Sequence, residues 1–177
     1  MKQTVLNTIE ELYHNGDFGY VLFNYVDTEV WSEKFINEIK EIYVDNLTDF
    51  NYSKCFTLFI QPSMNPKLKI GTNEFNSFIK ENGYLTGILV YISAIAPYAS
   101  IKYIKYEHAE NEIEIKEQYQ PFDESTKQIA NKIINYLEKE NIQILQEDLL
   151  EITVPNISLE LKEEDVTIFN CLFEDSY

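Results

Sequence analysis

The chain has 177 residues and a formal net charge of −16, from 30 acidic residues against 14 basic ones, and all 14 basic residues are lysines. Hydrophobic residues make up 45% and aromatic residues 14% of the chain, which excludes an intrinsically disordered protein. An acidic surface without the two-pronged guanidinium of arginine repels phosphate groups, so we expect the protein to bind neither nucleic acid nor a membrane.

The negative charge is concentrated at the C-terminal end. Residues 140–177 carry 10 acidic residues and one lysine, a net charge of −9, whereas residues 1–106 carry 12 acidic residues and 9 lysines. Acidic surfaces attract basic partners and speed their encounter in a salt-dependent way. The same charge also serves solubility alone, and the sequence leaves both interpretations open.

In the N-terminal half, the pattern of apolar residues predicts helices and strands in turn. Val5, Ile9 and Leu12 recur at the spacing of one helical face, and the following Asn15-Gly16 pair is typical of a helix end. A dense run of aromatic and β-branched residues indicates a buried strand. In chain order, we expect a helix over 3–14, a strand over 18–26, a helix that begins at Thr28 or Ser32 and ends at Ile42, a strand over 55–60 and a helix over 72–82.

The C-terminal half begins with three consecutive strand patterns. The third of them alternates, with Ile113 and Ile115 on one side and charged residues on the other. The residues 108–111 before it predict a hairpin turn. In chain order, we expect strands over 85–95, 100–106 and 112–119, a helix that begins at Asp123 or Ser125 and reaches Leu137, an edge strand over 157–162, a turn over 163–165 and a strand over 166–173 that is apolar on both faces.

This mixture of helices and neighbouring strands predicts an α+β protein, with a mostly antiparallel sheet and about four helices packed on it. The length is typical of one domain, so we expect residues 1–177 to form a single domain. The N-terminus has acidic residues where a signal peptide needs an apolar core, and no apolar run is long enough to span a bilayer. These features predict a cytoplasmic protein.

The sequence contains no motif of a catalytic, cofactor or metal site. Its five glycines lack the close spacing of a phosphate-binding loop, and the two histidines, His14 and His108, are too few for a histidine-based metal site. Cys55 and Cys171 each lie in an apolar run, which favours buried side chains over a disulfide or a nucleophile. We therefore assign no catalytic residue, no cofactor and no metal ligand.

One cluster leaves an enzymatic alternative open. Glu107, His108 and Glu110 combine carboxylates with an imidazole, which are groups that general acid–base catalysis uses. On an extended backbone, neighbouring residues point to opposite faces, so the cluster forms a carboxylate–histidine site only if its members share one face. A solvated hairpin tip accounts for the same residues without any chemistry.

The C-terminal region combines acidic residues with aromatic ones. An exposed aromatic ring provides a desolvated anchor in a protein interface, and surrounding charges speed the encounter and fix the register. The same aromatic residues could instead belong to the core, with the acidic residues as its solvated rim. The candidate partner-binding residues are Glu160, Glu163, Glu164, Asp165, Phe173, Glu174, Asp175 and Tyr177.

Two stretches resemble the small acidic immunity proteins of bacterial polymorphic toxin systems in size, charge and texture. They are the closing stretch Val-Pro-Asn-Ile-Ser-Leu-Glu-Leu-Lys-Glu-Glu-Asp-Val-Thr-Ile-Phe-Asn-Cys-Leu-Phe-Glu-Asp, from Val154 to Asp175, and the preceding helix pattern Asp-Glu-Ser-Thr-Lys-Gln-Ile-Ala-Asn-Lys-Ile. The resemblance is to the class as a whole, so it assigns no role to any single residue. It implies a cytoplasmic antitoxin that binds its cognate toxin domain and blocks the active site without chemistry of its own.

The sequence thus favours a non-catalytic acidic binding protein, of the immunity or inhibitor type, that contacts a basic protein partner such as a nuclease-type toxin. Two alternatives remain. One is the small enzyme with a site around His108, and the other is a scaffold domain whose edge strands pair with copies of themselves.

Overall fold

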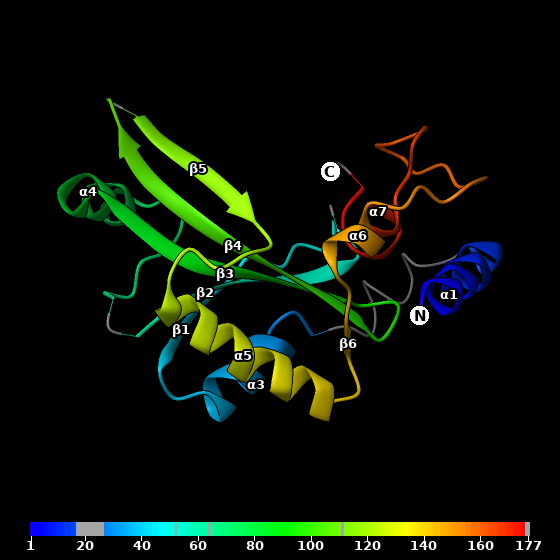
Figure 1. Ribbon diagram of the computed structural model, residues 1–177, viewed down its shortest axis with the longest axis horizontal. Coiled ribbons are helices and arrows are strands. Elements are labelled where there is room, and N and C mark those ends of the chain that lie inside the picture. The colour runs from blue at the N-terminus through cyan, green and yellow to red at the C-terminus, as the bar shows by residue number, and fades with distance from the viewer. Residues whose placement is uncertain (17–26, 52, 64, 111, 176–177) are drawn as a thin grey trace.

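The computed structural model describes residues 1–16, 27–51, 53–63, 65–110 and 112–175. They form an α+β fold with a six-stranded, mostly antiparallel sheet, as the sequence predicts (Figure 1). The strand predicted over 18–26 lies outside the described residues. The elements are α1 (Lys2–Asn15), α3 (Val30–Glu38), β1 (Ile42–Asn46), β2 (Cys55–Pro62), α4 (Asn73–Asn82), β3 (Tyr84–Ser93), β4 (Tyr98–Ala109), β5 (Glu112–Gln118), α5 (Glu124–Lys139), β6 (Gln143–Ile144), α6 (Glu147–Leu150) and α7 (Ile168–Leu172).

The sheet has the strand order β1-β2-β3-β4-β5, and each of these neighbours is antiparallel. The long strand β4 pairs with β5 from Tyr103 to Ala109, and its first residues, Tyr98 and Ala99, pair in parallel with β6. Within the described part of the chain, β5 pairs with β4 alone. β5 is therefore an edge strand.

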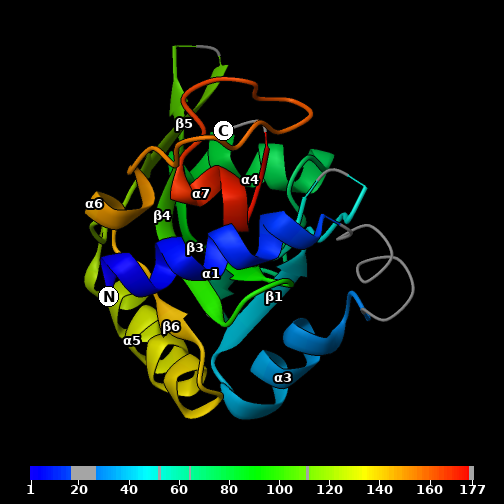
Figure 2. The ribbon, with the colours of Figure 1, turned by 90° about the vertical axis from the view of Figure 1, so that its right-hand side faces the viewer.

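Helices cover both faces of the sheet (Figures 1 and 2). α3 and α5 lie on one face, over a hydrophobic cluster that includes Leu58, Ile88 and Val90. α1, α4, α6 and α7 lie on the other face, over a cluster that includes Phe59 and Leu89. Because successive side chains point to opposite faces, β2 and β3 supply both clusters and are buried at almost every position. None of the described helices is long and apolar enough to cross a membrane.

The four helices predicted from the sequence are present as α1, α3, α4 and α5. α1 ends at Gly16, which has the left-handed conformation at φ 69°. Thr72 caps α4 with its side chain, and Asp123 rather than Ser125 caps α5 by accepting the backbone N–H of Thr126 at 2.7 Å.

The second helix is shorter than predicted. α3 ends at Glu38, the backbone of Ile39 is extended, and Ile42 begins strand β1. Ile39 and Ile42 are three residues apart, a spacing that also fits one face of a helix, so the apolar pattern did not reveal the break. Pairing of β1 with β2, from Ile42 opposite Pro62 to Asn46 opposite Leu58, satisfies the backbone of this strand instead.

Two of the predicted C-terminal strands are wrong. Residues 157–162 belong to a loop, and the strand predicted over 166–173 contains the helix α7. Thr167 caps α7 by a reciprocal capping box with Asn170, and all five residues of the helix are buried. A short apolar run does not distinguish a buried strand from a buried helix turn, and here the packing of the run on all sides decided between them.

Candidate functional site

The acidic residues of the C-terminal region fall into two structurally distinct parts. The first is the acidic loop, residues 155–165, which projects from the end of the molecule that holds α6 and α7 (Figure 1). The second is the C-terminal tail, residues 173–175, which follows α7. The sequence analysis treated both parts as one candidate surface.

The acidic loop is pinned at its base and at its tip. At the base, Thr153 and Thr167 form an isolated antiparallel bridge, and the N–H of Val154 donates to the carbonyl of Val166 at 2.7 Å. At the tip, Leu159 and Lys162 exchange both backbone hydrogen bonds, at 2.9 and 3.3 Å. These bonds make residues 160 and 161 a two-residue turn, so backbone hydrogen bonds fix the conformation of the tip.

The loop exposes its charges and buries two anchors. Leu159 and Val166 are buried in the core, at 8% and 1% exposure, whereas Leu161 at the tip is 61% exposed. The exposed acidic side chains are those of Glu160, Glu163, Glu164 and Asp165. The loop thus carries four carboxylates and one lysine, Lys162, and it also exposes the apolar side chain of Leu161.

An open hollow of about 590 Å³ lies within the acidic loop. Its lining comes from both arms of the loop, 153–158 on one side and 163–166 on the other. Glu163, Glu164 and Asp165, which are consecutive in the chain, belong to this lining. A hollow with several carboxylates on one wall suits a cationic side chain.

Phe173, in the C-terminal tail, does not form the exposed anchor that the sequence suggested. Its side chain is fully buried, with ring centroids 5.2 Å from Phe169 and 6.3 Å from Tyr91. The reason is the helix α7, which brings Phe169 and Phe173 to the same side, one turn apart, against the sheet. Tyr177 lies outside the described residues.

The carboxylates of the tail are engaged within the protein. Asp175 forms an ion pair with Lys54, which precedes β2, and the N–H of Lys54 donates to the carbonyl of Phe173 at 2.8 Å. Burial lowers the pKa of Lys54 to about 8, and the nearby carboxylate of Glu174 acts in the opposite direction. Asp175 is thus held by an ion pair within the chain, and its role as a partner contact stays a prediction.

Glu174 is the second internal carboxylate of the tail. Burial raises its pKa, although the nearby ammonium groups of Lys102 and Lys54 act in the opposite direction. Lys102 is only 7% exposed, and its Nζ atom lies 4.9 Å from the ring centroid of Phe169 and 5.6 Å from that of Tyr119. Glu174 is partly buried in the neighbourhood of Lys102 and Lys54, and its role as a partner contact stays a prediction.

The cluster around His108 does not form a converging site. β4 continues through His108 to Ala109, so Glu107 and His108 point to opposite faces of the sheet. Glu107 accepts hydrogen bonds from Lys105 and Lys116, each at 2.6 Å, and these bonds lower its pKa to about 2. His108 is exposed. The described residues contain no group of three or more His, Cys, Asp and Glu side chains arranged to hold a metal ion.

The two cysteines are buried and not joined in a disulfide, as the sequence predicts. Both side chains are completely inaccessible to solvent. Burial raises the pKa of Cys55 and of Cys171 to about 12 each. At neutral pH both are thiols rather than thiolates, so neither can act as a nucleophile.

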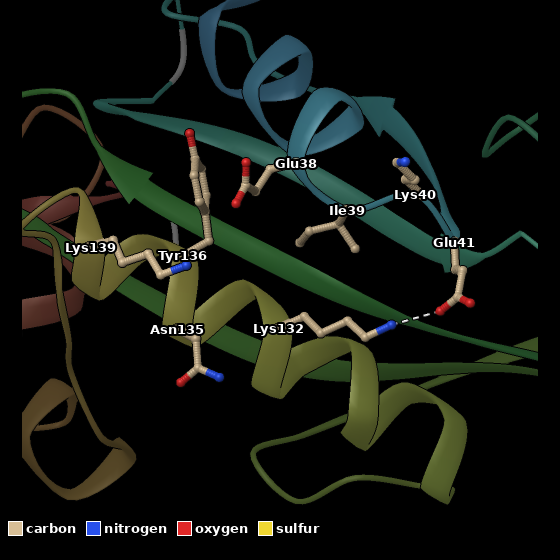
Figure 3. Close-up of a pocket in the computed structure, with 8 residues that line it drawn as sticks. All are labelled: Glu38, Ile39, Lys40, Glu41, Lys132, Asn135, Tyr136 and Lys139. Carbon is tan, nitrogen blue, oxygen red and sulfur yellow. Dashed lines mark hydrogen bonds and ion pairs between the residues drawn. The ribbon is translucent and has the colours of Figure 1, made fainter.

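A further hollow of about 400 Å³ lies between the end of α3 and the exposed side of α5 (Figure 3). Ile39 occupies its middle, and an ion pair of 2.6 Å between Lys132 and Glu41 spans one end. Glu38 and Tyr136 lie beside each other at the other end. Because cations and carboxylates are mixed around this hollow, its electrostatics favour neither sign of ligand.

A third hollow, of about 650 Å³, lies beside β4, near the residues of that strand that pair with β5 and β6. Ile101, Tyr103 and Tyr119 give it an apolar wall, and Glu147 and Asp148 from α6 add carboxylates to its rim. The sequence analysis did not identify this site. Its residues come from β4, α5, β6, α6 and the segments between them, and no local pattern connects them.

None of these three hollows is lined by Glu107 or His108. Comparison of the chain with protein-family models, with curated proteins and with solved structures found no match. The geometry of the chain itself is therefore the basis for a functional proposal.

Proposed function

We propose that this chain is a non-catalytic acidic binding protein of the immunity or inhibitor type, which captures a basic protein partner through the acidic loop. The observation that carries the proposal is the combination of four exposed carboxylates with the exposed side chain of Leu161, on a loop whose base and tip are each closed by backbone hydrogen bonds. A preorganised loop loses little conformational entropy on binding. Its charges accelerate encounter, and its apolar tip provides contact area.

The hollow inside the loop supports the same function. Its wall of Glu163, Glu164 and Asp165 offers several acceptors to one lysine or arginine side chain of a partner. An inhibitor of this kind blocks a cationic cleft by occupying it, and needs no catalytic group. The enzymatic alternative gains no comparable support, because Glu107 is bound by two lysines on the face opposite to His108.

The test is a pull-down from lysate of the source cell with the tagged chain, washed at low and then at high salt, followed by binding and activity assays with the purified partner. We expect one basic partner in fixed stoichiometry, whose association rate falls as salt rises because the charges are exposed. If the partner is a nuclease or another toxin enzyme, adding the chain must abolish its activity.

Two variants of equal charge separate a docking site from a general charge effect. In the loop variant, Glu160, Glu163 and Glu164 become Gln and Asp165 becomes Asn, and in the control variant Glu10, Glu11, Glu81 and Glu138 become Gln. Each variant loses four negative charges, so both have a formal net charge of −12 instead of −16. We expect the association rate to fall about tenfold or more for the loop variant and much less for the control. Equal losses in both variants, or no effect of salt, would contradict the proposal.

A further inference from the structure

The exposed edge strand β5 has a sequence that complements itself. The strand forms the outer border of the sheet, and no other element lies along its outer side in Figure 1. Six of its seven residues are exposed, and Ile115 at its centre is 58% exposed. An edge of this length presents unpaired backbone groups that can pair with another strand.

Side chains along β5 alternate between the two faces of the sheet. Glu114 and Lys116 lie opposite Glu107 and Lys105 of β4, on one face. Ile115 lies opposite Tyr106, on the other face. In its own chain, Lys116 is 2.6 Å from Glu107 and 3.9 Å from Glu114, so its ammonium group remains on the first face beside two carboxylates.

When two identical strands pair antiparallel about a two-fold axis, directly opposed side chains lie on the same face of the sheet. Neighbouring residues of one strand point to opposite faces, so the axis must pass through a residue and cannot pass between two residues. If the axis passes through Glu114 or Lys116, that residue opposes its own copy and like charges meet. If it passes through Ile113, Glu112 of each chain opposes Glu114 of the other, which again brings like charges together. Directly opposed like charges destabilise a strand pair, so these three registers are disfavoured.

The register centred on Ile115 is different. All seven residues of β5 find an opposite residue, and Glu114 of each chain opposes Lys116 of the other. Ile115 opposes its own copy and covers it, whereas Glu112 opposes Gln118 and Ile113 opposes Glu117. No like charges are directly opposed.

We propose that β5 pairs antiparallel with β5 of a second copy of this chain, about a two-fold axis through Ile115, and so joins the two sheets edge to edge. A seven-residue strand pair is smaller than a standard interface, so the dimer is weak and depends on concentration. Each copy has a net charge of −16, so added salt strengthens the dimer by screening repulsion between the copies. Partner binding by the acidic loop is expected to weaken as salt rises, whereas this dimer is expected to strengthen. Failure of either proposal leaves the other intact.

The experiment measures the dimer of the full chain by sedimentation velocity over a concentration series, with charge-reversal variants. In a dimer of Glu114→Lys, the new lysine opposes Lys116 in both symmetric pairs, and in a dimer of Lys116→Glu, the new glutamate opposes Glu114 in both pairs. Each variant alone is therefore expected to lower the association constant about tenfold or more. An equimolar mixture of the two variants restores opposite charges in both pairs, and is expected to form a heterodimer at least as readily as the wild type. A wild-type chain that stays monomeric at every concentration and salt level overturns the proposal.

Matched controls exclude effects of net charge and of folding. Glu10→Lys and Lys2→Glu make the same changes of charge on α1, and are expected to leave the dimer almost unchanged. Lys116→Glu also removes a contact to Glu107, so its fold is checked by circular dichroism. A misfolded variant cannot be rescued by mixing, and a mixture that shows no rescue overturns the proposed register.

A cysteine cross-link reads the register directly. Cβ atoms of directly opposed residues in an antiparallel pair lie about 5 Å apart, within reach of a disulfide. Under mild oxidation, Ile115→Cys is expected to give a covalent dimer, whereas Ile113→Cys, which opposes Glu117, is not. Cross-linking at residue 113 but not at residue 115 overturns the register centred on Ile115.

Discussion

The acidic loop and the C-terminal tail are close in sequence and similar in composition, yet they use their carboxylates in opposite ways. In the loop, four exposed carboxylates stand against Lys162. In the tail, Asp175 forms an ion pair with Lys54, and Glu174 lies partly buried within the electrostatic influence of Lys102 and Lys54. The loop therefore presents net negative charge to solvent, whereas the charges of the tail compensate each other inside the protein.

The difference shows that the net charge of a segment does not measure the carboxylates that are available for binding. Lys54 lies more than one hundred residues before Asp175 in the chain, and only the fold brings the two together. Phe173 makes the start of the tail a part of the core, whereas the loop places Leu159 in the core and leaves its four carboxylates exposed. The following predictions test this division.

The largest expected effect separates the apolar residues of the two regions. Phe173→Ala empties space in the core and is expected to lower the free energy of unfolding by about 3–5 kcal/mol. Leu161→Ala, at a 61% exposed position, is expected to change it by about 0.5 kcal/mol or less. Urea unfolding followed by circular dichroism measures both, and similar losses in the two variants would contradict the division.

An intermediate effect is expected for the ion pair of the tail. Lys54→Met retains the apolar stem but leaves Asp175 without its cation in a site where the two side chains are 12% and 21% exposed. We expect a loss of about 1–3 kcal/mol, between the values for exposed and for fully buried pairs. The control is Glu163→Gln in the acidic loop, for which we expect a change within about 0.5 kcal/mol. A neutral Lys54→Met would show that the pair does not hold the tail.

The smallest effect concerns the dependence of stability on pH. Burial raises the pKa of Glu174 above its ordinary value of 4.5, so in this window the folded state binds more protons than the unfolded state. The contribution of this carboxyl to stability therefore falls as pH rises from 4.5 through its folded-state pKa. Glu174→Gln removes this titration. The free energy of unfolding of the variant, minus that of the wild type, is expected to rise with pH from 4.5 toward neutrality, as measured by urea unfolding at each pH. A constant difference would show that Glu174 is not desolvated.

The exposed acidic loop could be predicted from the sequence, but its separation from the C-terminal tail could not. The exposed acidic residues from Glu160 to Asp165 follow from composition, because a charged run with few apolar residues has no means of burial. The sequence leaves Phe173 open between an exposed anchor and a core residue, because an apolar run fits a strand with an exposed end as well as a buried helix turn. The Thr167 and Asn170 pair, three residues apart, was the available signal for a helix cap, although asparagine at the second position is not the usual capping-box residue.

The sequence by itself determined the elements whose patterns are long and locally complete. The stripes of α1, α4 and α5, the caps Thr72 and Asp123, and the apolar strands β2 and β3 all depend on neighbours within a few residues. From these, the α+β class and the mostly antiparallel sheet follow.

Tertiary structure alone decided the short elements and the roles of the charges. Strand β1 has five residues, β6 has two and α7 has five, and elements of this length owe their form to distant partners rather than to local propensity. In the same way, pairing with a lysine from β4 or from the residue before β2 separates the carboxylates of the tail from those of the loop. Coulomb energy depends on distance in space and on desolvation, and neither can be read from positions along the chain.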